Sequence, residues 1–494
     1  MTQITQQPLY DVLPVGQQII FTVNETSAVQ NKFNVKYVAS VYVDNFPVSQ
    51  NDINTGNHLV ATFKTTPNGA GRGIFDLRSL LESYVSSDNT GFGGASSGNR
   101  SEYKGVLYSS NTPHPIHLID KFCGNTNAAR WFRVNFSVEG SATAIAPVLT
   151  LSNSTVSSVD FVFFNGVLQR SDYLTQGILN GSGELEAGNR YGYDLEKNLL
   201  YPGLNPAYGK GRFLTNAPTT QYANINDYGT FAFLTFLPTS STTNRMKWVE
   251  FKYYSSAGVL LGTDLKDAKY GNGFFTDLQS RANSKLGYVG AFPGNLQNIS
   301  GTFKTLVAAG TIQGGYYTVT PKNASSDYGE TYTINLNCPN LKGFESIRLC
   351  WLNQWGVWDY YTFTQKSIRT TSTNRTTYTQ MSGTWNSDSY QISGYKGGKK
   401  NFRVNSLEKI RVNTDFVSED DAVWFEELVN SPEVYILNGY DSTETAPYNT
   451  MTGKYVEPVL VTTSSYTRKT IANDKLMQYT FELERNKDQQ IQTS

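Results

Sequence analysis

A period-two alternation of apolar and polar residues recurs along most of this chain and constrains its fold more than any other feature. Alternation of this kind predicts a strand with one buried face and one wet face. It runs through residues 33–43, 132–138, 249–253, 332–338 and 477–483. Antiparallel sheets tolerate a wet face, whereas parallel sheets rarely do. The chain is therefore predicted to be mainly β, with several antiparallel β-sandwich-like modules in series and two short helices.

Turn residues between the apolar runs agree with this fold class. Asn165-Gly166 follows the apolar run Phe161–Phe164, and Ser256-Ala257-Gly258 lies between two further apolar runs. Both are typical of the tight turns that join antiparallel strands. We therefore expect a hairpin at each position.

The first predicted helix covers residues 75–85. Leu77, Leu80, Leu81 and Tyr84 have helical spacing there, and a glycine-rich turn over 68–73 precedes them.

The second predicted helix covers residues 418–429. Ser418 is a suitable N-cap, Asp421 stands at the capping-box position, and Ser431-Pro432 would end the helix. Its apolar face would consist of Val423, Trp424 and Leu428. A strand is expected directly afterwards, over 433–437.

Composition shifts predict four parts. The expected parts are an N-terminal β domain over 1–140 with helix 75–85, a linker and small β module over 141–225, a β domain over 226–328, and a C-terminal β domain over 329–494 with helix 418–429. The linker prediction depends on residues 140–158, which are rich in Ser, Thr and Ala.

Charge and composition exclude several classes of protein. The chain has 494 residues, of which 41 are basic and 41 acidic, and 13% of its residues are aromatic. So many aromatics argue against general disorder, and the lack of excess positive charge argues against a nucleic-acid-binding protein of the usual basic kind. No apolar run approaches the roughly 18 residues of a membrane span. We therefore expect no nucleic-acid partner and no membrane insertion.

The N-terminal sequence and the cysteines indicate the compartment. The sequence MTQITQQPLYDVLPVGQQ has no basic start, apolar core or small-residue cleavage site, which predicts no secretory signal. Cys123, Cys338 and Cys350 are odd in number and form no C-x-x-C, which argues against a disulfide framework or a zinc knuckle. We expect synthesis in a reducing cytoplasm.

One segment contains the residue types of a metal site. His114, His117 and Asp120 lie close together with Cys123 just downstream, and such side chains bind zinc in other proteins. The spacing matches no zinc-protease pattern, and neighbouring prolines favour an extended chain in which the two histidines point to opposite faces. Cys123 also lacks the sequence context of a nucleophile paired with His117. We predict no metal or catalytic residue in this segment.

Two further features have structural explanations. Gly69, Gly71 and Gly73 are similar to a phosphate-binding loop, but no Lys-Ser/Thr pair or parallel β-α-β setting accompanies them. Acids at 419–421 suit the positive end of a helix. The paired carboxylates of a sugar hydrolase are a spatial arrangement that sequence spacing does not reveal. We therefore predict a non-enzymatic protein without catalytic, cofactor-binding or metal residues, and without a cofactor.

An aromatic cluster is the strongest candidate for binding. It consists of Trp351, Trp355, Trp358, Tyr360 and Tyr361. Exposed aromatics stack on sugars or anchor protein interfaces. The alternative is a hairpin that turns near Gln354–Gly356 and whose aromatics fill a sandwich core, and we favour it for most of these residues.

Seven segments together carry a resemblance to a known family. They are RLCWLNQWGVWDYYTF (348–363), SGYKGGKKNFRVNSLEKIRVNT (393–414), EDDAVWFEELVNSPEVYILNGY (419–440), EPVLVTTSSYTRKT (457–470) with the later YTFELERN, YDVLPVGQQIIFTV (10–23) and FKTTPNGAGRGIFDLR (63–78). They resemble structural (virion) proteins of tailed bacteriophages, of the type found in marine viral sequences. The segment WFEELxxSPEVY is also similar to segments of phages that infect Bacteroidota, and 163–169 is similar to a hairpin of phage fibre and adhesin modules.

The resemblance implies a structural component of a tailed-phage virion and transfers no site residue. We expect a tail or baseplate protein that assembles in the host cytoplasm through symmetric interfaces, with other copies of itself and other virion proteins as partners. One alternative is a receptor-binding or tail-fibre-tip protein that recognises host surface glycans. Capsid decoration or head–tail joining is a second alternative, and a polysaccharide depolymerase is a third.

Overall fold

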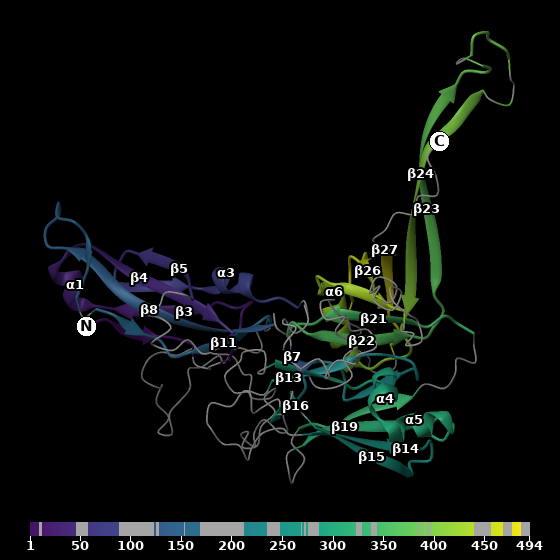
Figure 1. Ribbon diagram of the computed structural model, residues 1–494, viewed down its shortest axis with the longest axis horizontal. Helices are drawn as coiled ribbons and strands as arrows, with labels where there is room; N and C mark the ends of the chain where they lie inside the picture. The colour runs from purple at the N-terminus through teal and green to yellow at the C-terminus, as the bar shows by residue number, and fades with distance from the viewer. Residues whose placement is uncertain are drawn as a thin grey trace. The chain divides into compact units, whose positions relative to one another are not determined.

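The computed structural model describes most of the chain and defines its sheets (Figure 1). The described residues are 1–8, 12–45, 58–87, 123–124, 128–152, 154–167, 212–234, 248–267, 269–270, 273–274, 286–322, 329–336, 343–384, 387–392, 395, 397–438, 456–467 and 477–485.

Contacts divide the chain into two compact units. The first comprises Met1–Cys338, Leu352–Asp359 and Asp441–Thr452, and the second comprises Pro339–Trp351, Tyr360–Tyr440 and Gly453–Ser494. The fold is mainly β, as predicted.

A sandwich forms the N-terminal part of the first unit. One sheet has the order β2 (Val12–Pro14), β11 (Phe161–Phe164), β8 (Ala129–Ser141), β4 (Phe33–Asp44), β5 (Leu59–Thr65), with β9 (Leu149–Thr150) and β10 (Val156–Ser157) also on β8. The other has the order β1 (Gln3–Gln6), β3 (Ile20–Asn24), β6 (Arg72–Asp76). Phe21 of the smaller sheet packs on Phe132, Phe136 and Phe161 of the larger one, with ring centroids 5.5–6.3 Å apart. The short helix α1 (Thr26–Asn31) follows β3.

Two more sheets of the first unit meet through aromatic rings. The larger has the order β12 (Thr220–Ala223), β20 (Tyr332–Leu336), β19 (Tyr316–Lys322), β14 (Trp248–Tyr254), β15 (Leu260–Asp267). The smaller has the order β13 (Thr230–Leu234), β18 (Leu286–Gly290), β7 (Cys123–Gly124), and β16 (Lys269–Tyr270) pairs with β17 (Gly273–Phe274). Phe231 and Tyr332 join the two sheets, 5.1 Å apart between centroids. Helix α4 (Pro293–Ile299) leads into α5 (Gly301–Ala308), whose Phe303 packs on Tyr253.

The second unit is built on one seven-stranded sheet and one helix. The strand order is β22 (Trp358–Phe363), β21 (Ile347–Leu352), β25 (Val434–Leu437), β26 (Val456–Val461), β27 (Thr480–Arg485), β24 (Gly398–Asn413), β23 (Ile368–Gln380). Helix α6 (Glu419–Asn430) covers one face: Phe425 packs on Tyr361 and Phe481, and Trp424 packs on Trp351. The core of this unit therefore lies between α6 and the sheet.

The alternating segments form the predicted strands. Segments 33–43, 132–138 and 249–253 lie in β4, β8 and β14, residues 332–336 form β20, and residues 480–483 lie in β27. The predicted hairpin at Ser256-Ala257-Gly258 joins β14 to β15. Gly258 has a φ of +78° there, a conformation that suits glycine. Helix α6 begins directly after Ser418, whose side chain accepts a hydrogen bond from the Asp421 backbone in a complete capping box. The N-cap and the capping box of this helix were therefore predicted correctly.

The N-terminal helix prediction was too long. Phe75 lies in β6, the α-helix α3 covers only Arg78–Leu81, and a 3₁₀ turn over Glu82–Tyr84 follows it. Phe75 pairs with Phe21 in the sheet, so sheet pairing overrides the helical spacing at the start of the segment. The described residues also contain α1, α4 and α5, which the sequence analysis did not predict.

The hairpin expected at Asn165-Gly166 was wrong. Strand β11 pairs with β2 on one side and with β8 on the other along Val162–Phe164, so neither edge is open to a following strand. The linker predicted over 140–158 was also partly wrong, because β8 continues to Ser141 and both β9 and β10 pair with β8.

Strand pairing crosses the expected domain boundaries. β19 and β20 lie on opposite sides of the boundary expected at 328/329, yet they pair in one antiparallel sheet. β7 pairs with β18, although these strands were assigned to different domains. The first unit therefore continues to Cys338, past the boundary expected at 328/329 between the third and fourth parts.

Candidate functional site

The candidate site is a long hairpin ribbon that leaves the sheet of the second unit. β23 pairs with β24 along its whole length, from the pair of Ile368 and Arg411 to the pair of Gln380 and Gly398. By contrast, β27 pairs with β24 only over Lys409–Asn413. We call residues 372–407 the arm. Figure 1 shows β23 and β24 running on beyond the sheet as a two-stranded ribbon. At the usual strand rise of about 3.3 Å per residue, its nine paired residues of β23 span roughly 30 Å.

The arm is exposed along both faces. Every residue of β23 from Ile368 to Thr379 is exposed, and the arm part of β24 is exposed or half-buried. β23 contains six threonines, which favour strand geometry through β-branching and supply no apolar face for a core. Among the described strands, β23 ends the sheet, so its outer edge is open.

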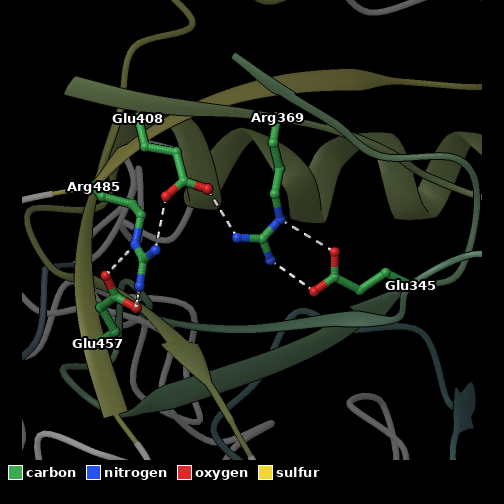
Figure 2. A network of polar contacts seen from close by, with 5 residues as sticks. All are labelled: Glu345, Arg369, Glu408, Glu457 and Arg485. Carbon is green, nitrogen blue, oxygen red and sulfur yellow. Dashed lines mark hydrogen bonds and ion pairs between the residues drawn. The ribbon is translucent and has the colours of Figure 1, made fainter. Parts of the chain in front are cut away.

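A ladder of ion pairs fixes the arm to the sheet at its base (Figure 2). Arg485 on β27 donates to Glu408 on β24 at 2.8 Å and to Glu457 on β26 at 2.6 Å. Arg369 on β23 donates to the other oxygen of Glu408 at 2.9 Å and to Glu345 at 2.7 Å. Five charged side chains thus link four strands and the segment before β21.

The ladder lies on the core side of the sheet. Ile410 pairs with Arg369 on one side and with Leu483 on the other, and directly paired residues share a face. Ile410 and Leu483 are buried. One step toward the arm, the inward position of β24 is Glu408. The ladder therefore closes the apolar core where the arm begins.

The hydrogen bonds of the ladder favour the charged forms of Glu408, Arg485 and Arg369. Hydrogen bonding from Arg485, and secondarily from Arg369, lowers the pKa of Glu408 against the opposing effect of burial. Hydrogen bonding to Glu457 and Glu408 raises the pKa of Arg485, and hydrogen bonding to Glu345 raises that of Arg369. Glu408 therefore remains ionised to a lower pH than an ordinary glutamate does.

Aromatic and basic side chains gather on the arm. Tyr378 and Phe402 are in edge-to-face contact, with centroids 6.5 Å apart, beside a bulge in β24. Lys400 pairs with Tyr378 across the ribbon, and Arg403 directly follows Phe402 along β24. Toward the tip, Tyr390, Ile392 and Tyr395 are exposed. No pattern in the sequence predicted this site, although FRVNS and GGKKN lie within the segments that carry the family resemblance.

The aromatic cluster predicted from the sequence is mostly core. Trp351, Trp355 and Tyr360 are buried, and Trp358 and Tyr361 are half-buried. The β21–β22 hairpin turns at 353–357, close to the predicted position. This confirms the structural explanation, so the three tryptophans offer no flat exposed platform for a sugar.

The metal-like segment and the glycine-rich turn identified from the sequence have different outcomes. His114, His117 and Asp120 lie outside the described residues, while the backbone of Cys123 lies in β7. The glycine-rich turn is a local structure in which Asn68 Oδ1 accepts hydrogen bonds from the Ala70 and Arg72 backbone. Within the described part of the chain, no group of three His, Cys, Asp or Glu side chains is placed to hold a metal ion.

No helix in the described ranges is long and apolar enough to cross a membrane.

Comparisons with known proteins give no family. No protein-family model matches the chain, and no curated protein matches it. Two similar solved structures are the native conformation of E. coli alpha-2-macroglobulin and Salmonella alpha-2-macroglobulin reacted with methylamine. The first is 7% identical with a TM-score of 0.18 and covers 83% of this chain and 21% of its own. The second is 7% identical with a TM-score of 0.16 and covers 97% of this chain and 23% of its own. The chain spans less than a quarter of either protein, and TM-scores this low do not establish a shared fold.

Proposed function

We propose that the protein is a non-enzymatic structural component of a tailed-phage virion, in the tail or baseplate, that assembles through repeated subunit interfaces. The observation that carries this proposal is the arm. A two-stranded ribbon in water is marginally stable at best, because it buries too little apolar surface. A chain that keeps such a ribbon, and fixes its base with five charged side chains, supplies a rigid element for contact with another molecule.

Open strand edges support the same role. An unpaired edge presents backbone donors and acceptors to any neighbouring strand, and proteins that do not use such an edge usually shorten or cover it. The edge of β23 runs for thirteen residues. Pairing or packing on it by a neighbouring subunit would satisfy those groups. Many such contacts summed over a ring give a stable particle from weak interfaces.

Mass spectrometry of purified particles tests the virion assignment. We expect the chain in density-purified particles of the phage that encodes it, at many copies per particle. Absence of the chain from both intact particles and disrupted particles would overturn the proposal.

The tip of the arm favours one second candidate, a receptor-binding protein. Ile392 and Tyr395 are each 81% exposed and Tyr390 is also exposed, and aromatic side chains at a loop tip suit stacking on a sugar. Binding of the purified chain to host surface glycans on an array, abolished by Tyr390→Ala and Tyr395→Ala, would support this candidate. No binding to glycans or host cells would exclude it.

A further inference from the structure

Charge is distributed unevenly within the second unit. The arm has five basic residues and one acidic residue, whereas residues 415–433 have seven acidic residues and no basic one. The whole chain nevertheless has equal numbers of acids and bases. Each of these two surfaces therefore has an electrostatic complement within the same chain.

The outer face of α6 is the acidic surface. Its exposed side chains are Glu419, Asp420 and Val423, on the side opposite Trp424, Phe425 and Leu428, while Glu426 and Glu427 are half-buried. Val423 is 47% exposed, and Phe416 just before the helix is 64% exposed. An apolar centre with a charged rim is the usual composition of a protein interface. This helix patch consists of Phe416, Glu419, Asp420 and Val423.

The arm has the matching composition with the opposite charge. Tyr378 and Phe402 form its apolar centre, 36% and 53% exposed, and Lys400 and Arg403 flank them. This arm patch therefore presents aromatic rings and cations, and the helix patch presents apolar side chains and carboxylates. Aromatic residues and arginine are enriched in the centres of interfaces.

We propose that the arm patch of one copy docks on the helix patch of a second copy. Figure 1 shows the arm running away from the sheet that α6 covers. The arm patch therefore does not reach the helix patch of its own chain, whereas the arm of a second copy can. A contact between different patches of identical chains is heterologous, and repetition closes it into a ring or extends it as a filament. The inference deepens the proposed assembly role and rests on it.

A second copy suits these residues better than a nucleic acid. Binding to phosphates scales with the number of cations that face the backbone. The arm patch contains two cations, and Lys399 and Arg375 lie on the other face of the ribbon according to its register. A stripe of cations along one face is therefore lacking among the described residues of the arm, whereas two cations match the two exposed acids of the helix patch.

Reciprocal charge reversal in the full chain tests the contact. Variant A carries Lys400→Glu and Arg403→Glu, and variant B carries Glu419→Lys and Asp420→Lys. Sedimentation velocity over a wide range of concentration should show self-association of the wild type that weakens as salt is added. Each variant alone should associate at least about tenfold more weakly, because like charges then face one another. An equimolar mixture of A and B, or one chain with all four changes, should restore association.

A matched control separates this effect from net charge. Lys304→Glu and Lys366→Glu also reverse two exposed cations, outside both patches, and should leave association at the wild-type level. Far-ultraviolet circular dichroism and thermal unfolding report whether each variant is folded. Variant B keeps Ser418 and Asp421, so the capping box of α6 remains.

The remaining outcomes overturn the inference. They are no self-association of the wild type, association that neither variant changes, and loss in both variants without rescue by mixing. Loss of DNA binding by variant A with unchanged self-association would assign the arm to nucleic acid instead. The virion assignment is measured separately on particles, so the two proposals fail in distinguishable ways.

Discussion

Arg485 on β27 donates a hydrogen bond from Nη1 to Oε2 of Glu408 on β24, at 2.8 Å. This contact lies where the apolar core of the second unit ends and the arm begins. Glu408 also accepts from Arg369, and Arg485 also donates to Glu457. The arm is thus held by side chains from β23, β24, β26 and β27. The ladder gives a solvent-exposed ribbon a fixed base without any apolar packing of its own.

Arg485→Met should destabilise the second unit by roughly 1–3 kcal/mol, because it leaves Glu408 and Glu457 partly buried without their shared cation. Chemical unfolding followed by tryptophan fluorescence measures the change. The control is Arg411→Met, which removes an exposed pair with Glu482 on the opposite face. That change should cost less than about 1 kcal/mol. Equal effects of the two substitutions would contradict a special role for the ladder.

The contribution of Glu408 should depend on pH. Its folded-state pKa is lowered, so its stabilising effect is fully present above the unfolded-state value of about 4.3. The effect is lost as pH falls through the lower folded-state pKa, because protonation removes the charge that both arginines bind. The difference in unfolding free energy between wild type and Glu408→Gln should therefore be largest near neutral pH and shrink below about pH 4. A difference that grows toward acid would contradict this assignment.

The two faces of α6 should respond differently to truncation. Phe425 is fully buried among aromatic rings, so Phe425→Ala should cost about 3–5 kcal/mol. Val423 lies on the outer face, so Val423→Ala should change stability by less than about 0.5 kcal/mol. Thermal unfolding of both variants checks this. A large effect at Val423 would place it in the core, as the sequence analysis expected.

Much of the second unit could be predicted from the sequence, because its signals are local. Ser418, Asp421 and Ser431-Pro432 mark both ends of α6, and the alternation before Leu483 marks β27. The assignment of Val423 to the apolar face was wrong. Ala422, Trp424 and Phe425 beside it are apolar, so the position of the buried face could not be read from the sequence. Phe425 lies on the buried side and contacts Phe363 and Phe481.

The arm could not be predicted for a different physical reason. In IRTTSTNRTTYTQ the threonines occupy both faces, so no apolar alternation indicates a strand. The ladder joins Glu345, Arg369, Glu408, Glu457 and Arg485, which are far apart in the chain. Only the pairing register brings them together. The boundary expected near 328 failed similarly, since pairing of β19 with β20 is a tertiary feature.

Removal of the arm should leave the body of the second unit folded. Ser372 and Leu407 are directly paired, so an Asn-Gly turn in place of residues 373–406 closes a short hairpin above the ladder. Neither strand of the arm contains a buried residue between Ser372 and Gln380 or between Gly398 and Leu407, so the melting temperature should stay close to that of the wild type. Self-association should be lost, as light scattering with size-exclusion chromatography would show. An unfolded truncated chain, or one that still assembles, would contradict the assembly role of the arm.

Immunogold labelling of intact particles with antibody against this chain, viewed by electron microscopy, would locate the protein in the virion. We expect label at the distal tail, at several symmetric positions. Label over the head or at the portal vertex would contradict the tail assignment and indicate decoration or joining. No label on intact or disrupted particles would contradict the virion role itself.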